Sequence, residues 1–181
     1  MKCAKTHPKS TLTYSVISIS DTRTPQTDHS GQWLVKRFQQ EGHQLQNYQI
    51  CPDEPKKIQQ HFQKNINQHI DLLLLTGGSG IAPRDITPET IEPYFCKKIP
   101  GFGELFRFLS YQEIGTNAIL SRASAGIVEN QNHYTAVFLL PGSTSAVQLA
   151  TEQLILPQLP HIFSLLSKEK NHHPPNLSPK I

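Results

Sequence analysis

Hydrophobic residues recur along the chain in two alternating patterns, and each pattern predicts a different kind of element. Short runs rich in β-branched and aliphatic residues predict strands at residues 14–20, 43–51, 70–75, 125–129 and 134–140. Apolar residues with helical spacing predict helices at residues 30–41, 88–95, 101–113 and 143–156, and another through Ile58, Phe62 and Ile66. Pro157 and Pro160 are expected to interrupt the last helix before a final turn at 161–166.

This alternation is typical of a single three-layer α/β/α domain with a mostly parallel sheet. The chain of 181 residues is long enough for one core of ordinary size. We expect the domain to span residues 13–167, between a frayed, polar N-terminal tail at 1–12 and a disordered tail at 168–181. The second tail is predicted from a Lys, Asn and Pro composition without periodicity.

The stretch IDLLLLTGGSGIAPRDITP, residues 70–88, is the most informative part of the sequence. Its continuous apolar run fits a strand buried on both faces of a parallel sheet, and the loop that follows is nearly bare of side chains. Thr87 and Pro88 are predicted to be the N-cap and first residue of a helix. A strand, a glycine loop and a helix start commonly bind a phosphate through main-chain N–H groups. The single acid of this loop, Asp85, suits a metal ion that bridges a carboxylate and a phosphate.

Other unusual residues follow the predicted strands directly. Ser20 and Asp21 follow the first strand, Asp53 follows the second, and Pro141-Gly142-Ser143 follows the last. Because ligands of open parallel sheets collect at the carboxyl ends of the strands, we expect these loops to share one pocket. Two simpler roles stay open, since Asp53 can cap the next helix and Asp85 can brace its loop against Arg84.

Several classes of protein do not fit the sequence. The residues after Gly80, Ile81-Ala82-Pro83-Arg84, lack the lysine and hydroxyl that follow the second glycine of a P-loop, and Pro83 replaces the last glycine of a dinucleotide fingerprint. A net charge of +3 without a basic stripe argues against nucleic acid as a partner. No apolar run is long enough to span a membrane, residues 1–10 lack the apolar middle of a signal peptide, and the three dispersed cysteines suit a reducing compartment. The predicted location is therefore the cytoplasm.

The segment 94–111 is richer in aromatic residues than one short helix usually buries within its own domain. Packing in the domain core is the simpler explanation, and a subunit interface is the alternative.

Several motifs in order and spacing resemble the MoaB/MogA family of molybdenum and tungsten cofactor biosynthesis proteins, which is related to the G domains of gephyrin and of its plant counterpart. The motifs are VISISDTRT (16–24), CPDE (51–54), TGGSG with PRDITPE (76–89), IPGFGELFRFLSYQEIG (99–115), ILSRASAG (119–126) and LPGSTSAV (140–147). The resemblance covers residues 12–167, and SYQEIG after PGFGE is more similar to MoaB than to MogA. Ser79 stands where many relatives have threonine, which keeps the hydroxyl.

The resemblance implies a molybdopterin-binding MogA/MoaB-like fold that assembles as a trimer or a hexamer, with the segment 94–111 in a subunit contact. The implied activity is molybdopterin adenylyl transfer with Mg-ATP, which releases pyrophosphate and supplies a molybdenum insertase. A non-catalytic molybdopterin carrier or scaffold is the alternative. By resemblance, Asp53 and Asp85 are the catalytic acids and the tentative Mg²⁺ ligands. The residues implied to bind molybdopterin or nucleotide are Ser20, Asp21, Thr76, Gly77, Gly78, Ser79, Gly80, Glu104, Ser121, Pro141, Gly142 and Ser143.

Overall fold

The computed structural model describes residues 11–169, so the predictions for residues 1–10 and 170–181 lie outside the described residues. The strands are β1 (Thr13–Ile19), β2 (Gln44–Cys51), β3 (Leu72–Thr76), β4 (Lys97–Lys98), β5 (Ser124–Asn130) and β6 (His133–Leu140). The α-helices are α1 (His29–Gln40), α2 (Pro55–Ile66), α3 (Thr87–Ile91), α4 (Pro100–Ile114), α5 (Thr144–Ala150) and α6 (Leu156–Glu169). Short 3₁₀ segments, η1 (Glu92–Tyr94) and η2 (Gly115–Leu120), follow α3 and α4, and a π-helical segment, η3 (Thr151–Ile155), joins α5 to α6.

The six strands form one mixed sheet in the order β2-β1-β3-β6-β5-β4. The strands β2, β1, β3 and β6 are parallel, whereas β5 and β4 join antiparallel at one edge. Ser18 pairs with Thr76, and Thr76 pairs with Leu140, so the carboxyl ends of β1, β3 and β6 are level. This confirms the predicted fold class and brings the loops after these strands to one edge of the sheet.

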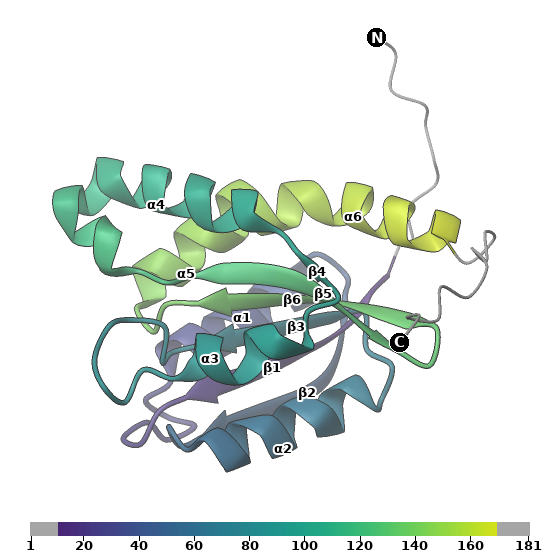
Figure 1. Cartoon of the computed structure of the whole chain (residues 1–181), viewed down its shortest axis with the longest axis horizontal. Coiled ribbons are helices and arrows are strands. Elements are labelled where there is room, and N and C mark those ends of the chain that lie inside the picture. Colours follow the sequence, from purple (N-terminus) through teal and green to yellow (C-terminus); the bar gives the residue numbers. More distant parts are fainter. Residues whose placement is uncertain (1–10, 170–181) are drawn as a thin grey trace, which may run out of the picture.

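Helices cover both faces of the sheet, with α4, α5 and α6 on one side and α2 and α3 on the other (Figure 1). Alternate residues of each central strand enter two separate cores, as the two-residue period of a strand requires. Leu72 and Leu74 pack with α1, α4, α5 and α6, while Leu73 and Leu75 pack with α2 and α3. None of the helices within residues 11–169 is long and apolar enough to cross a membrane.

The structure corrects the predicted starts of two helices. Asp28, not Ser30, is the N-cap of α1, and its side chain accepts a hydrogen bond from the N–H of Gly31. Ile86 occupies the N-cap position of α3, so Thr87 is the first helical residue. Both hydroxyl groups are used elsewhere, in hydrogen bonds to loop carbonyls that are described below.

The predicted helix interruptions at Pro157 and Pro160 are also wrong, and so is the predicted end of the frayed N-terminal tail at residue 12. The helical path continues from α5 through η3 into α6, and Pro160 lies inside α6. Ile155, Leu159 and Phe163 recur every fourth residue and are buried, so packing offsets the hydrogen bonds that proline cannot donate. Leu12, placed by the sequence in the frayed tail, belongs to the core at 2% exposure.

The aromatic-rich helix α4 has two different faces. Phe102 and Phe106 are buried in the core, as the simpler explanation predicts. Leu105, Phe108 and Tyr111 are 55–61% exposed. Together with Ile114, they recur every third residue of α4, and with the exposed Ile119 of η2 they make up what we call the α4 apolar face.

Candidate functional site

A cavity of about 400 Å³ opens at the carboxyl edge of the parallel strands. The loop after β1 leads to α1 on one face of the sheet, whereas the loop after β3 leads to α3 on the other face, and the divergence of such neighbouring connections opens a crevice. The cavity is lined by Ile19, Ser20, Asp21, Thr22, Arg23, Asp53, Gly77, Gly78, Ser79, Gly80, Arg84, Asp85, Ser121, Pro141, Gly142 and Ser143. Asp85 and Ser143 therefore face the same cavity, as the shared-pocket hypothesis requires.

Two residues that the resemblance implies for the site do not line this cavity. Thr76 is buried, and its hydroxyl donates to the carbonyl of Pro141 at 2.7 Å. Glu104 is exposed on α4 and lines a second cavity of about 480 Å³. Ser121 lines both cavities, so the two are neighbours.

The loop between β3 and α3, residues 77–86, is called the glycine loop below. Its first carbonyl groups point away from the cavity. Thr87 donates from its hydroxyl to the carbonyl of Gly77 and from its N–H to the carbonyl of Gly78, both at 3.0 Å. In a trans peptide the C=O of one residue and the N–H of the next point in opposite directions. Among the described residues, the N–H groups of Gly78, Ser79 and Gly80 have no hydrogen-bond acceptor. These free donors beside the cavity form an anion-binding arrangement.

Glycine is required at two positions of this loop by both backbone conformation and space. Gly77 has φ +104°, and a Cβ there would lie 2.2 Å from the carbonyl oxygen of Ile19. Gly78 has φ +62°, and its Cβ would lie 2.3 Å from the Thr87 hydroxyl. A side chain at either position would push apart the loops that close the cavity.

The loop after β6 has the same organisation. The carbonyl of Leu140 accepts from the N–H of Gly77, and the carbonyl of Pro141 accepts from the Thr76 hydroxyl. The carbonyl of Gly142 accepts from the Arg23 guanidinium at 2.6 Å and from the Ser30 hydroxyl at 2.9 Å. The N–H of Ser143 therefore points away from these partners, and it has no acceptor within residues 11–169.

The carboxylates of Asp21, Asp53 and Asp85 line the cavity together with these donors. Of the three, Asp53 has the least favourable surroundings for its charge. Its Oδ1 is buried without a hydrogen-bond partner among the described residues, and this atom lies 3.0 Å from the position of a Cβ on Gly78. Burial raises the pKa of Asp53, and the charges of Asp21 and Asp85 raise it further. The N-cap of α2 is Glu54, so Asp53 is not the helix cap.

Asp85 has a structural contact and also faces the cavity. Its Oδ2 accepts from the N–H of Ala82 at 2.8 Å, and Asp85 donates from its own N–H to the carbonyl of Ala82. The loop is thus braced through Ala82 and not through Arg84. One carboxylate oxygen braces the loop, which leaves the other for a ligand.

The residues at this edge fit a magnesium ion that is shared with a phosphate. An unpartnered buried carboxylate oxygen with a raised pKa is the environment that a cation relieves. No three His, Cys, Asp or Glu side chains of residues 11–169 are arranged to hold a metal by themselves. A cation held here by Asp53 and Asp85 would need water and substrate phosphates to complete its shell, which is the way Mg²⁺ is commonly bound.

Two charged residues that the sequence pattern does not single out, Arg23 and Asp28, support the cavity wall. Asp28 is fully buried and accepts from Arg23 at 2.9 Å and from the Tyr48 hydroxyl at 2.7 Å. Burial raises the pKa of Asp28, but the surrounding donors, among them Tyr48, Gly31 and Arg23, outweigh burial and hold the pKa below its ordinary value. The N-cap spacing of Asp28 offered a local signal for its position, whereas nothing local marks the partners of Arg23.

Comparison with known proteins places this geometry in a family. A family model described as "Probable molybdopterin binding domain" matches residues 15–161. Molybdenum cofactor biosynthesis protein B of Bacillus subtilis (strain 168) is 46% identical over 157 residues, which cover 86% of this chain and 90% of that protein. The protein of the same name from Halalkalibacterium halodurans is 45% identical and covers 92% of this chain and 96% of its own length.

Solved structures agree with these matches. A crystal structure of a molybdenum cofactor biosynthesis protein B has a TM-score of 0.81 at 42% identity, and it covers 90% of this chain and 99% of that one. The tungsten cofactor synthesizing protein MoaB from Pyrococcus furiosus has a TM-score of 0.80 at 36% identity and covers 88% and 98%. With most of its length matched, the chain belongs to the family of molybdenum cofactor biosynthesis proteins that carry a molybdopterin-binding domain.

Proposed function

We propose that this protein is a molybdopterin adenylyltransferase that uses Mg-ATP. In this reaction an oxygen of the terminal phosphate of molybdopterin attacks the α-phosphorus of ATP. The bond between the α-phosphorus and its bridging oxygen breaks, and pyrophosphate leaves. The phosphate is already ionised at neutral pH, so the reaction needs no general base from the protein.

The observation that carries this proposal is the combination of free N–H groups and carboxylates around one cavity. Two loops, after β3 and β6, present N–H donors from Gly78 to Gly80 and from Ser143, which suits a ligand with more than one phosphate. Two phosphorylated molecules repel each other, and fixed dipoles together with a divalent cation reduce that repulsion. Bound Mg²⁺ would neutralise charge on the phosphates, and Asp85 and Asp53 are the residues to hold it.

The direct test is pyrophosphate release by the purified protein in the presence of molybdopterin and Mg-ATP. Pyrophosphate that depends on both substrates supports the transferase. Tight binding of molybdopterin without pyrophosphate release would instead indicate the carrier or scaffold role.

Ser143→Glu should weaken the binding of Mg-ATP about five- to tenfold. A carboxylate would replace a hydroxyl where the N–H of residue 143 faces the cavity, and it would repel the phosphates. Calorimetric titration measures this change. Ser145→Glu is the matched control, since it adds the same charge to an exposed residue of α5 outside the cavity lining. Equal affinity for the wild type and Ser143→Glu would refute the phosphate position at this loop.

We also propose that the α4 apolar face contacts a second copy of the chain within the implied trimer or hexamer. Its large apolar side chains, including Phe108 at 61% exposure, form a patch of the kind that marks a protein interface. Phe108→Glu should shift the molar mass in light scattering from oligomer to monomer, because burial of the new charge is unfavourable. Gln60→Glu on the exposed side of α2 should leave the mass unchanged. A monomeric wild-type protein would contradict this assembly.

A further inference from the structure

Arg122 contacts the backbone of the glycine loop through both its main chain and its side chain. It follows η2 and precedes β5, far from the loop in sequence. Its N–H donates to the carbonyl of Ser79 at 2.9 Å. Its guanidinium donates through Nε to the carbonyl of Gly80 and through Nη2 to the carbonyl of Asp85, both at 2.6 Å. Arg122 lines the neighbouring cavity of about 480 Å³ but not the cavity that contains Asp85, so at the latter its contacts are with the loop.

These contacts determine where the next N–H groups point. A trans peptide directs its N–H opposite to its C=O. The hydrogen bond from Arg122 to the carbonyl of Ser79 therefore directs the N–H of Gly80 away from Arg122, and the bond to the carbonyl of Gly80 does the same for Ile81. Neither N–H has an acceptor in the described part of the chain.

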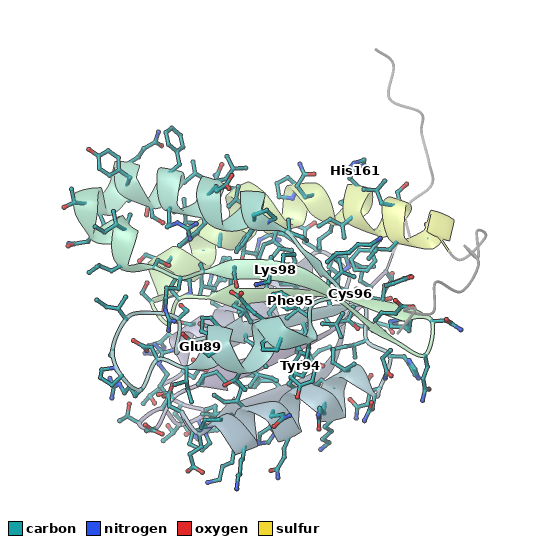
Figure 2. The ribbon with its side chains drawn as sticks, in the orientation of Figure 1. Glu89, Tyr94, Phe95, Cys96, Lys98 and His161 are labelled. Atoms are coloured by element: carbon teal, nitrogen blue, oxygen red, sulfur yellow. The ribbon has the colours of Figure 1, made fainter. Side chains whose placement is uncertain are left out.

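The guanidinium of Arg122 is also bound by a residue outside the glycine loop. Its Nη1 donates to the carboxylate of Glu89 on α3, and Arg122 lowers the pKa of that carboxyl group through this hydrogen bond. Figure 2 shows Glu89 on α3, at the side of the loop that precedes this helix. Arg122 is 34% exposed, so it is a partly buried bridge between the loop and α3.

The shape of the arginine side chain is essential to this arrangement. Three guanidinium nitrogens reach three acceptors that lie in different directions: the carbonyls of Gly80 and Asp85 and the carboxylate of Glu89. A planar guanidinium presents donors in a fixed fork, whereas the single ammonium of lysine cannot span such a set. Lysine would thus keep the positive charge but lose the bridge.

We propose that Arg122 is a positioning residue that fixes the phosphate-binding conformation of the glycine loop. It orients the N–H groups of Gly80 and Ile81 and holds the backbone of Asp85, and it does so from outside the lining of the cavity that contains Asp85. This inference rests on the proposed function, because it takes the ligand of the loop to be a phosphate.

The test compares the wild type with Arg122→Lys, and its probe is inorganic pyrophosphate at a fixed concentration of Mg²⁺. We expect Arg122→Lys to bind pyrophosphate at least about fivefold more weakly, although the charge is unchanged. In amide NMR spectra, pyrophosphate should shift the resonances of Gly80 and Ile81 in the wild type and shift them much less in the variant. The resonance of Ser143 should still respond in both proteins, because Arg122 does not contact the loop after β6.

Arg37→Lys is the matched control, since Arg37 pairs with Glu41 and Glu152 away from the cavity and should bind pyrophosphate as the wild type does. Wild-type affinity and amide shifts in Arg122→Lys would overturn the positioning role while the proposed function stands. Absence of pyrophosphate binding by the wild type would instead overturn the proposed function, and the role of Arg122 with it. If Arg122→Lys does not fold, Glu89→Gln decides the matter: an affinity at least about twofold lower supports the role, and an unchanged affinity overturns it.

Discussion

Asp85→Asn is expected to lower the rate of pyrophosphate release by at least about a hundredfold while the fold is retained. An asparagine keeps a side-chain oxygen that can accept from the N–H of Ala82, so the loop brace survives. The substitution removes the negative charge beside the glycine loop, which in the proposed reaction holds a magnesium ion close to a phosphate. Steady-state kinetics with molybdopterin and Mg-ATP, together with a melting curve, measure both effects.

Nucleotide binding with and without Mg²⁺ separates loss of a metal ligand from damage to the loop. In EDTA, Asp85→Asn should bind ATP as well as the wild type or better, because a negative charge has left an anion site. With Mg²⁺ present, the wild type should gain affinity and the variant should gain little. Glu129→Gln on β5 is the matched control, since it exchanges an exposed carboxylate for an amide outside the cavity. Undiminished turnover in Asp85→Asn would remove this residue from the mechanism.

The elements that the sequence predicts well are those whose pattern depends on burial alone. The run Leu72–Leu75 is apolar at every position because both faces of β3 are covered, and this pattern also identifies β3 as a central strand. Once four parallel strands are inferred, the rule that ligands collect at their carboxyl ends places Asp53, Asp85 and Ser143 together. The structure brings these three residues to one cavity, as that rule predicts.

The errors arise where a distant partner decides between two locally equivalent choices. Asp28 and Ser30 are both good N-cap residues, and the sequence offers no reason to prefer Asp28. The structure uses Ser30 to hold the carbonyl of Gly142, more than a hundred residues away, which leaves the cap to Asp28. Thr87 is similar, because its hydroxyl holds the carbonyl of Gly77. Helix-capping rules consider only near neighbours, so they cannot include these contacts.

Distant partners also explain why the sequence does not predict the role of Arg122, although Arg122 lies in the motif ILSRASAG (119–126). Its acceptors in the loop are main-chain carbonyls, and no side-chain pattern in the sequence indicates a bond to a carbonyl. At Pro160 the sequence gives a strong local signal for a helix break, but tertiary packing outweighs that signal. The buried stripe through Leu159 and Phe163 keeps α6 continuous despite a residue that removes a backbone donor.

Asp53→Asn is expected to make the protein more stable and less active. The wild-type carboxylate holds a buried oxygen without a partner and faces the charges of Asp21 and Asp85. An amide removes this repulsion, so the melting temperature at pH 8 should rise, by roughly 2–4 °C for each kcal/mol recovered in a domain of this size. Turnover should fall, because the same charge is available to hold Mg²⁺ when substrate is bound. Calorimetry and the pyrophosphate assay measure the two effects separately.

The dependence of this stability difference on pH follows from the direction of the shift. Burial raises the pKa of Asp53 in the folded protein above its unfolded value. Below about pH 4, the ordinary pKa of aspartate, the Asp53 carboxyl is protonated in both the folded and the unfolded protein, so it does not lower the free energy of unfolding. As the pH rises from there to the raised pKa of the folded protein, ionised Asp53 lowers the free energy of unfolding by a growing amount. Above that pKa the loss is constant. The melting temperatures of the wild type and Asp53→Asn should therefore converge in acid and separate towards neutral pH.

Asp28→Asn provides the comparison of opposite sign, because the pKa of Asp28 is lowered in the folded protein. Its carboxylate accepts from Arg23, Tyr48 and Gly31, so it contributes stability above its unfolded pKa that is lost as the pH falls through its folded pKa. Asp28→Asn should lower the free energy of unfolding at neutral pH by about 1–3 kcal/mol. A lower melting temperature for both variants at pH 8 would show that Asp53 is a satisfied carboxylate like Asp28. It would then have no unmet need for a cation, and the assignment of Asp53 as a metal ligand would fail.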